Sequence, residues 1–365
     1  MPYVIRDPKY SFFSVFDPKT GAYVRSGIIE NGLDTNVDPF MAAFPHLIDV
    51  GVMGHCIHGR TGLCVKAGIG CYQSGLTVEE PNMTVEDFRW IARQCRHRTN
   101  QFALGGRGDP DQHEHFAELL QICRENEIVP NFTTSGYGMT PKLAQLCKEY
   151  CGAVAVSWYR SAYTLRAIQL LLDAGVKTNV HYVLGKNTMD EALQRLETEN
   201  FPHGINGIVF LLHKPAGLGS KENMLADDDP RVVQFFSYVD KGSHAYKIGV
   251  DSCTVPGIVN HCRSVTPQSL DTCEGGRFSC YVSADMQMMP CSFDQEKRFG
   301  VSLRGSSIED VWNSPAFDAF RHSLRTSCPD CPQRDACMGG CPLMPEVVLC
   351  SSPQRKLHNL GCINS

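Results

Sequence analysis

Four cysteines near the end of the chain constrain its fold more than any other feature. Cys328, Cys331, Cys337 and Cys341 fall within fourteen residues and are separated by two, five and three positions. Thiols this dense are not explained by packing in a hydrophobic core, so they predict a metal centre. Zinc is the simplest alternative, because Cys-x2-Cys pairs often bind zinc.

The cysteine content of the whole chain favours iron over zinc. The chain has 18 cysteines in 365 residues, and its N-terminus does not resemble a signal peptide. Metal ligation is therefore a better explanation than disulfides. The C-terminal third holds more thiols than one tetrahedral zinc site needs. The further cysteines of that third are Cys253, Cys262, Cys273, Cys280, Cys291, Cys350 and Cys362.

A second group of thiols follows the apolar run 47–53, which we expect to form a buried strand. Cys56, Cys64 and Cys71 lie in a loop with five glycines, and these glycines allow the loop to bend until the thiols converge. Three thiols can hold three irons of a 4Fe–4S cluster and leave the fourth iron open to a small molecule. A zinc loop and three unrelated thiols are the alternatives, and His55 and His58 are close enough to be ligands.

The remaining composition excludes several classes of protein. With 42% hydrophobic and 20% charged residues, the chain has the composition of a soluble globular protein. Its formal charge of −5 gives no basic field for nucleic acid or an anionic membrane. We find no apolar run of membrane-spanning length. We therefore expect a cytoplasmic protein that binds neither nucleic acid nor membrane.

Between residues 46 and 250, strand-like apolar runs alternate with amphipathic helical stretches. This pattern predicts an α/β fold in which helices cover a parallel sheet. Six units are fewer than the eight of a closed barrel, so we expect an open, partial (β/α)6 TIM-like barrel. Its ligands should gather at the carboxyl ends of the strands, where the loop with Cys56 lies. The expected strands are 47–53, 101–105, 128–134, 153–158, 176–184 and 207–212, and the expected helices are 84–97, 111–126, 141–150, 162–174 and 189–199.

Residues 1–45 predict a short antiparallel lead-in. Two strand-like runs, 10–16 and 22–25, flank the turn signal at 17–21 and form a predicted β-hairpin. The chain is thus expected to have three parts: the lead-in 1–45, the partial barrel 46–250 and a cysteine-rich domain 251–365.

Several residues that follow the expected strands are candidates for binding a cofactor. Glycines after the second strand allow a ligand to approach the backbone, and the carboxylate that follows them can accept hydrogen bonds from an ammonium group. A simple connecting turn is an equally good explanation of these glycines. A hydroxyl within a strand more often bonds to a neighbouring backbone group. The candidates are Gly105, Gly106, Gly108, Asp109, Ser157 and Arg166.

These features together resemble the radical S-adenosylmethionine (SAM) superfamily. The resemblance rests on the three-cysteine loop, on Gly-Gly-x-Gly-Asp-Pro at 105–110 and on Thr-Thr-Ser-Gly at 133–136. The cysteines are separated by seven and six residues, whereas the family usually has three and two. Asp109 stands where the family has glutamate. Both departures are chemically tolerable, because a longer loop can still converge and aspartate can still accept from an ammonium.

The C-terminal third resembles the SPASM extension, which carries two auxiliary 4Fe–4S clusters in radical SAM enzymes. The resemblance covers roughly 250–365 and includes the segments 283–291 and 307–314. It implies no ligand role for Cys253 or Cys262, and Cys350 competes with Cys362 for one position. The implied inner ligands are Cys273, Cys280, Cys291 and Cys341, and the implied outer ligands are Cys328, Cys331, Cys337 and Cys362.

The resemblance also implies an activity. A radical SAM enzyme uses SAM and a first cluster, here held by Cys56, Cys64 and Cys71, to make a 5′-deoxyadenosyl radical that abstracts hydrogen. Asp109 and its preceding glycines would meet the SAM ammonium, and Ser157 and Arg166 would meet its ribose or carboxylate. The chain would thus carry three 4Fe–4S clusters. A flavodoxin or ferredoxin-type protein is the expected reductant.

The implied substrate is a peptide or protein side chain. Auxiliary clusters with four cysteine ligands have no open iron, so electron transfer and net oxidation are expected, as in cross-linking or dehydrogenation by a peptide maturase. One alternative is oxidation of a small molecule such as a sugar alcohol or an amino-acid derivative. A non-catalytic iron–sulfur electron carrier is an alternative of another class. The glycine motif and the barrel argue against it, because a carrier needs no SAM pocket.

Overall fold

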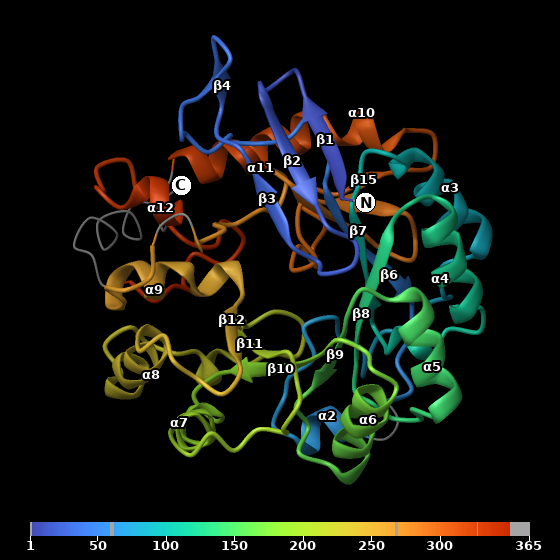
Figure 1. Ribbon diagram of the computed structural model, residues 1–365, viewed down its shortest axis with the longest axis vertical. Helices are drawn as coiled ribbons and strands as arrows, with labels where there is room; N and C mark the ends of the chain where they lie inside the picture. The colour runs from blue at the N-terminus through green and yellow to red at the C-terminus, as the bar shows by residue number, and fades with distance from the viewer. Residues whose placement is uncertain (1, 59–61, 267–268, 327, 351–365) are drawn as a thin grey trace.

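The computed structural model describes residues 2–58, 62–266, 269–326 and 328–350 (Figure 1). Its centre is a ten-stranded sheet in the order β12-β11-β10-β9-β8-β7-β6-β13-β14-β15. Strands β6 to β12 run parallel to one another, and β13 pairs in parallel with β6, whereas β14 pairs antiparallel with both β13 and β15. The strands are β6 (Leu47–Met53), β7 (Gln101–Gly106), β8 (Val129–Thr134), β9 (Val154–Ser157), β10 (Thr178–Leu184), β11 (Gly207–Leu212), β12 (Lys247–Val250), β13 (Ser279–Val282), β14 (Gln287–Met289) and β15 (Val301–Ser302).

The predicted alternation of strands and helices is confirmed. The six expected strands are β6 to β11 in chain order, and β12 adds a seventh parallel strand. In the described residues the sheet is open, with β12 and β15 as its edge strands. That the sheet curves into a partial barrel stays a prediction. The helices that follow these strands are α3 (Val85–Cys95), α4 (Phe116–Glu125), α5 (Pro141–Tyr150), α6 (Ala162–Asp173), α7 (Met189–Glu197) and α8 (Pro230–Asp240).

Local capping fixes where several of these helices begin. The side chains of Thr84, Thr140 and Ser161 each accept a hydrogen bond from the backbone N–H three residues later. Such caps satisfy N–H groups that have no partner within the helix. Figure 1 shows α3 to α8 along the outer side of the row of strands. The loops that follow the carboxyl ends of the strands connect the strands to these helices.

The two faces of the sheet differ in character. Ile48 and Val50 of β6 are fully buried toward the helices, whereas Asp49 between them is partly accessible on the opposite, inner face. The strand β10 repeats this alternation along its whole length. Because successive side chains of a strand point to opposite faces, the inner face is a separate, more polar surface. Its polar residues are Asp49, Asn131, Thr133, Asn179 and His181.

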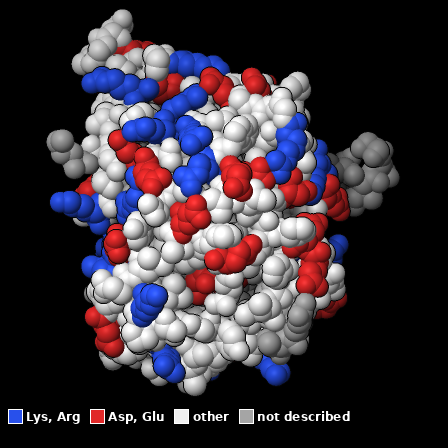
Figure 2. Space-filling view, turned by 90° about the vertical axis from the view of Figure 1, so that its right-hand side faces the viewer, with Lys and Arg blue, Asp and Glu red and all other residues white. Residues whose placement is uncertain are grey.

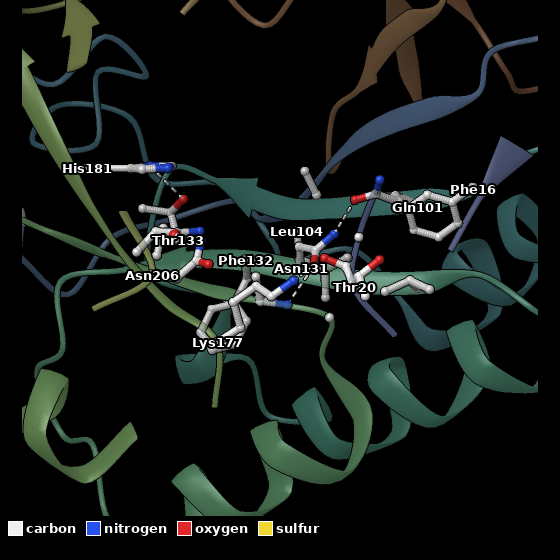
Figure 3. A pocket seen from close by; sticks show the side chains of 17 residues that line it. Phe16, Thr20, Gln101, Leu104, Asn131, Phe132, Thr133, Lys177, His181 and Asn206 are labelled. Atoms are coloured by element: carbon white, nitrogen blue, oxygen red, sulfur yellow. Dashed lines mark hydrogen bonds between the residues drawn. The ribbon is translucent and has the colours of Figure 1, made fainter. Parts of the chain in front are cut away.

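A cavity of about 370 Å³ opens on the inner face at the amino ends of the strands (Figure 3). Its polar side chains partly bond to one another, as in the 2.7 Å bond from Asn131 Nδ2 to Gln101 Oε1. His181 Nδ1 lies 3.2 Å from Thr133 Oγ1. Lys177 bonds to the carbonyl of Thr20 in the N-terminal turn, at the mouth of the cavity. The cavity therefore lies at the end of the sheet opposite to the cysteine loop.

The N-terminal residues form small antiparallel sheets. In the hairpin of β2 and β3, Phe16 pairs with Tyr23 around the turn that the sequence predicts. Phe12 packs edge-on against Phe278 at 6.1 Å, so this segment also contacts the C-terminal part of the chain. The strands are β1 (Tyr3–Asp7), β2 (Phe12–Phe16), β3 (Tyr23–Arg25), β4 (Ile29–Glu30) and β5 (Leu33–Asp34).

The C-terminal residues join the central sheet. Strand β13 pairs in parallel with β6, and Tyr281 lies opposite Asp49 in the register. The sheet therefore runs across residue 250, where the sequence predicts a domain boundary. Trp312 is fully buried and donates to the carbonyl of Ala42 at 2.9 Å. The helices here are α9 (Val255–His261), α10 (Ile308–Trp312), α11 (Pro315–Thr326) and α12 (Arg334–Cys337).

The surface agrees with the modest net charge. Figure 2 shows Lys and Arg side chains lying among Asp and Glu side chains on one face of the molecule. None of the helices in the described part of the chain is long and apolar enough to span a membrane.

The carboxyl group of Asp49 should make stability depend on pH. Burial raises its pKa to about 7 in the folded protein, whereas an unfolded aspartate has a pKa of about 3.9. Between these values the unfolded chain loses a proton that the folded chain keeps, so the free energy of unfolding falls as pH rises and levels off above about 7. Asp49→Asn should remove this loss, which is at most about 4 kcal/mol.

Thermal unfolding of wild type and Asp49→Asn between pH 5 and pH 8 measures this effect. The stability advantage of the variant should grow up to about pH 7 and then stay constant. Asp240→Asn is the matched control, because Asp240 is only partly buried and its carboxylate accepts from the N–H groups of Arg263 and Ser264. An advantage of Asp49→Asn that is equal at all pH values would contradict the expectation.

Candidate metal and cofactor sites

The first group of thiols lies beyond the carboxyl end of β6. Cys64 is in the short helix α2 (Leu63–Lys66), and Cys56 and Cys71 lie on either side of it. Cys56 and Cys71 both flank Gly75: a Cβ atom added there would lie 3.0 Å from Cβ of Cys56 and 3.5 Å from Sγ of Cys71. Burial, together with the thiols of Cys56 and Cys71, raises the pKa of Cys64 to about 11. The structure thus brings the three thiols into one neighbourhood, which we call the first thiol set.

Loops from distant strands hold the first thiol set in place. The carbonyl of Cys71 accepts from the N–H of Leu218, in the loop after β11, at 2.9 Å. The carbonyl of Ala67 accepts from Nη1 of Arg160, just after β9, at 2.7 Å. A Cβ atom on Gly70 would lie only 2.5 Å from the carbonyl oxygen of Leu218, so glycine is required for this contact. The loop is therefore fixed by backbone contacts that involve no thiol.

The glycines at and just beyond the end of β7 have two different roles. Gly106 has φ of +111°, and a Cβ atom there would lie 2.4 Å from the carbonyl oxygen of Met53. A Cβ atom on Gly108 would lie 2.5 Å from the carbonyl oxygen of His55. Both glycines therefore permit close packing against the cysteine loop. Gly105 has open space around its Cα atom and is the position that leaves room for a ligand.

Asp109 lies beside the first thiol set and is firmly held. Its carboxylate accepts from the N–H of Ser135 at 2.9 Å and from the Ser135 hydroxyl at 2.5 Å. Nε2 of His58 lies 3.0 Å from the same carboxylate and 2.9 Å from the Ser135 hydroxyl. The Thr-Thr-Ser-Gly segment at the end of β8 therefore positions Asp109 through Ser135. His58 Nε2, named above as a candidate metal ligand, is directed to this group.

The structure separates the two other candidates for SAM binding. Ser157 ends β9 and lies close to the first thiol set, whereas Arg166 is exposed to solvent on α6. Tyr159, which sequence reasoning missed, lies between Ser157 and Cys64. Burial and then the Cys64 thiol raise the pKa of Tyr159 well above its ordinary value. The only sequence signal for Tyr159 is its position directly after a parallel strand.

Four other thiols form an inner thiol set: Cys253, Cys273, Cys291 and Cys341. A Cβ atom on Gly275 would lie 3.6 Å from Sγ of Cys273 and 3.6 Å from Cβ of Cys291. The Cys341 thiol, followed by burial, raises the pKa of Cys253 well above its ordinary value. Burial and then Cys253 raise the pKa of Cys273 to about 12. Cys253, which the resemblance leaves without a ligand role, is therefore a member of this set.

Cys280 lies apart from the inner thiol set. It pairs in register with Ile48, which is fully buried on the helix-covered face. Burial raises the pKa of Cys280, and the nearest thiol that adds to this effect is Cys95 of α3. Because neighbouring residues in register share a face, Cys280 points into the hydrophobic core. Strand alternation is the reason why it does not join Cys273 and Cys291.

The outer thiol set lies around α12. Burial raises the pKa of Cys337, and the thiols of Cys350, Cys331 and Cys328 raise it further. The N–H of Cys331 donates to the carbonyl of Cys328 at 3.1 Å, which closes the Cys-x2-Cys turn. Cys362 lies outside the described residues. Within the described part of the chain, Cys350 is the fourth thiol of this set.

Aromatic rings connect the first and inner thiol sets. Tyr72 directly follows Cys71, and Phe293 lies two residues after Cys291. Their ring centroids are 4.4 Å apart with an interplanar angle of 31°. The side chains that follow Cys71 and Cys291 are thus in direct contact. This ring contact brings the first and inner thiol sets toward one region of the molecule.

The donor chemistry of the three sets suits iron–sulfur clusters. Each set gathers three or four thiols, and a 4Fe–4S cluster takes its thiolates at different irons. In the described residues, no three or more His, Cys, Asp and Glu side chains surround a point that could hold one metal ion.

Comparison with known proteins identifies part of the chain. Residues 273–332 match the family described as SPASM, an iron-sulfur cluster-binding domain. The match spans the inner cysteines 273 and 291 and the start of the outer thiol set. A search of curated protein sequences found no match.

Solved structures share the fold of nearly the whole chain. Streptococcus suis SuiB bound to S-adenosylmethionine has a TM-score of 0.64 at 14% identity, over 85% of this chain and 77% of SuiB. SuiB bound to its precursor peptide SuiA has a TM-score of 0.67 at 11% identity, over 96% and 99%. Native anSMEcpe with bound AdoMet has a TM-score of 0.56 at 16% identity, over 81% and 89%. These structures show that the fold of the chain is shared with proteins that have been solved with S-adenosylmethionine or a precursor peptide, and the family match confirms the expected SPASM domain.

Proposed function

We propose that this chain is a radical SAM enzyme that oxidises a peptide or protein side chain. The observation that carries the proposal is the meeting of the first and inner thiol sets beside Gly105 and Asp109. Similar folds support it, since SuiB has been solved with S-adenosylmethionine and with a precursor peptide, and anSMEcpe with AdoMet and a peptide. A first cluster with an open iron would bind SAM and form the radical. A neighbouring cluster with four thiolate ligands would then take an electron from the substrate radical.

Cys56, Cys64 and Cys71 would hold the cluster that binds SAM. When bound, this cluster and SAM supply hydrogen-atom abstraction. Gly105 leaves space for the cofactor, and the carboxylate of Asp109 accepts from its ammonium group. His58 and Ser135 hold that carboxylate in place. Ser157 and Tyr159 would line the same site. Arg166 is exposed, so it is not included among the proposed SAM-binding residues.

The inner and outer thiol sets would hold the two auxiliary clusters. Cys253 takes the inner position that the sequence resemblance gives to Cys280. In the outer set, Cys350 is proposed as fourth ligand in place of Cys362. With four thiolates each, neither cluster has an open iron, so both would transfer electrons and not bind substrate. Net oxidation, such as cross-linking or dehydrogenation, follows, and a flavodoxin or ferredoxin-type protein would supply the first electron.

Removing one thiol of the first set tests the central activity. Cys64→Ala should abolish formation of 5′-deoxyadenosine from SAM in anaerobically reconstituted protein reduced with dithionite. Cys123→Ala is the matched control, because Cys123 is buried in α4 away from the three thiol sets. Chromatography of the product measures both variants. Wild-type amounts of 5′-deoxyadenosine from Cys64→Ala would refute the assignment.

Iron content distinguishes Cys253 from Cys280 as an inner ligand. Wild type should contain about 12 irons per chain, and Cys253→Ala should lose one cluster and retain about 8. Cys280→Ala should keep about 12 irons and lose only about 1 kcal/mol or more of stability, because a small buried side chain is shortened. If Cys280→Ala loses iron and Cys253→Ala does not, Cys280 is the inner ligand, as the sequence resemblance implies, and the proposed assignment of Cys253 is wrong.

A second pair of variants tests the outer set. Cys350→Ala should lose the outer cluster, because Cys350 lies with Cys328, Cys331 and Cys337. Cys362→Ala should retain it. Mössbauer spectroscopy of the reconstituted variants counts the clusters that remain. Loss of the outer cluster from Cys362→Ala alone would contradict the proposed ligand.

A further inference from the structure

A buried ion pair lies beside the inner thiol set. Nζ of Lys214 is 2.6 Å from Oδ2 of Asp251, and the side chain of Lys214 is only 2% exposed. The ammonium also donates to the carbonyl of Leu212 at 3.0 Å. It lies 4.5 Å from the ring centroid of Phe293. None of these atoms is a proposed cluster ligand, so the pair has no role in the function proposed above.

Strand geometry brings this pair to the inner thiol set. Strands β11 and β12 are parallel neighbours, and Lys214 and Asp251 follow their carboxyl ends. Asp251 precedes Cys253 by two residues. Its carboxylate also accepts from the N–H of Leu212 at 3.2 Å and from the hydroxyl of Thr254 at 2.7 Å. The pair is therefore fixed at the start of the segment that carries Cys253.

The charges of the pair act on two members of the set. The carboxylate of Asp251 accepts from the hydroxyl of Thr254, the residue after Cys253. The ammonium of Lys214 lies over the ring of Phe293, two residues after Cys291. Phe293, which the ammonium contacts, stacks on Tyr72 beside the first thiol set. Lys214 thus lies close to the region where the two sets meet. Screening by water is weak at a side chain so completely buried.

We propose that Lys214 and Asp251 set the reduction potential of the inner cluster, Lys214 raising it and Asp251 lowering it. This inference rests on the proposed function, because it requires a cluster in the inner thiol set. Reduction adds one electron to a cluster that four thiolates already make negative. A neighbouring cation stabilises the reduced form more than the oxidised form, and a neighbouring anion does the reverse. Both residues are positioning residues, since neither contacts the reacting atoms of the substrate.

The cost of burying the pair supports a specific role. Two charges removed from water lose solvation that their mutual attraction often only balances, and apolar residues of similar size are frequently as stable. If the pair served only packing, its replacement would leave the reduction potential of the cluster unchanged. If the pair tunes the cluster, removing the positive charge and removing the negative charge must shift that potential in opposite directions. The experiment measures the sign of these two shifts.

Redox titration of the full chain, reconstituted anaerobically and monitored by EPR, tests the proposal. The signal that is missing in Cys253→Ala identifies the inner cluster. Lys214→Met should shift the midpoint potential of this signal to a more negative value, and Asp251→Asn should shift it to a more positive value. Lys214→Arg should stay close to wild type because it keeps the charge. The signal of the outer cluster serves as an internal reference that should not move.

Lys297 and Asp285 provide a matched control. They form an ion pair in the same part of the chain, but their side chains are about 41% and 40% exposed. Lys297→Met should leave all potentials unchanged, because solvent screens exposed charges.

The possible results separate the two proposals. Shifts of the same sign in Lys214→Met and Asp251→Asn, or no shift in either, overturn the tuning role while leaving the cluster assignment intact. If Lys214→Met does not retain the inner iron, Asp251→Asn decides alone, and its potential must rise. A wild-type protein without any inner cluster signal contradicts the proposed function itself.

Discussion

The parallel pairing of β13 with β6 is the contact on which the candidate sites depend. It joins residues more than two hundred positions apart and sets Tyr281 opposite Asp49. Strand β14 pairs with β13 and leads to the segment that carries Cys291. Tyr72 and Phe293 then stack, and the first and inner thiol sets share one region. A different register would shift alternate side chains to the other face and separate the two sets.

The fold was largely predictable because its signals are local. Apolar runs and helical periodicity predict β6 to β11 in the correct order, and the turn at 17–21 marks the hairpin of β2 and β3. The pairing of β13 with β6 could not be predicted in this way. It depends on which strand edge is free after the sheet has formed, and no local pattern contains that information. The seventh parallel strand, β12, has only four residues.

The candidate sites show the same division between local and distant information. The dense run from Cys328 to Cys341 and the loop from Cys56 to Cys71 stand out in the sequence. The structure keeps the thiols of the loop together but assigns Cys341 to the inner thiol set and the rest of the dense run to the outer set. Spacing alone could not separate Cys280 from Cys253, because the choice depends on the face to which a strand residue points. Arg166 is exposed on α6 for a related reason: the position of a residue around a helix, not its distance along the chain, decides which way it faces. Lys214 and Tyr159 gave no sequence signal beyond their positions after strands.

The continuous sheet has a consequence for how this protein can be divided. A chain that stopped at residue 250 would leave the β13-facing side of β6 as a free edge, with backbone donors and acceptors open to other molecules. Exposed edges of this kind invite association between chains. In the cysteine-rich part, β13 would lose β6, the strand with which it pairs in parallel. The cysteine-rich part is thus built into the central sheet and is not an independent module. Moving it onto another enzyme would also require moving the strand β6 with which it pairs.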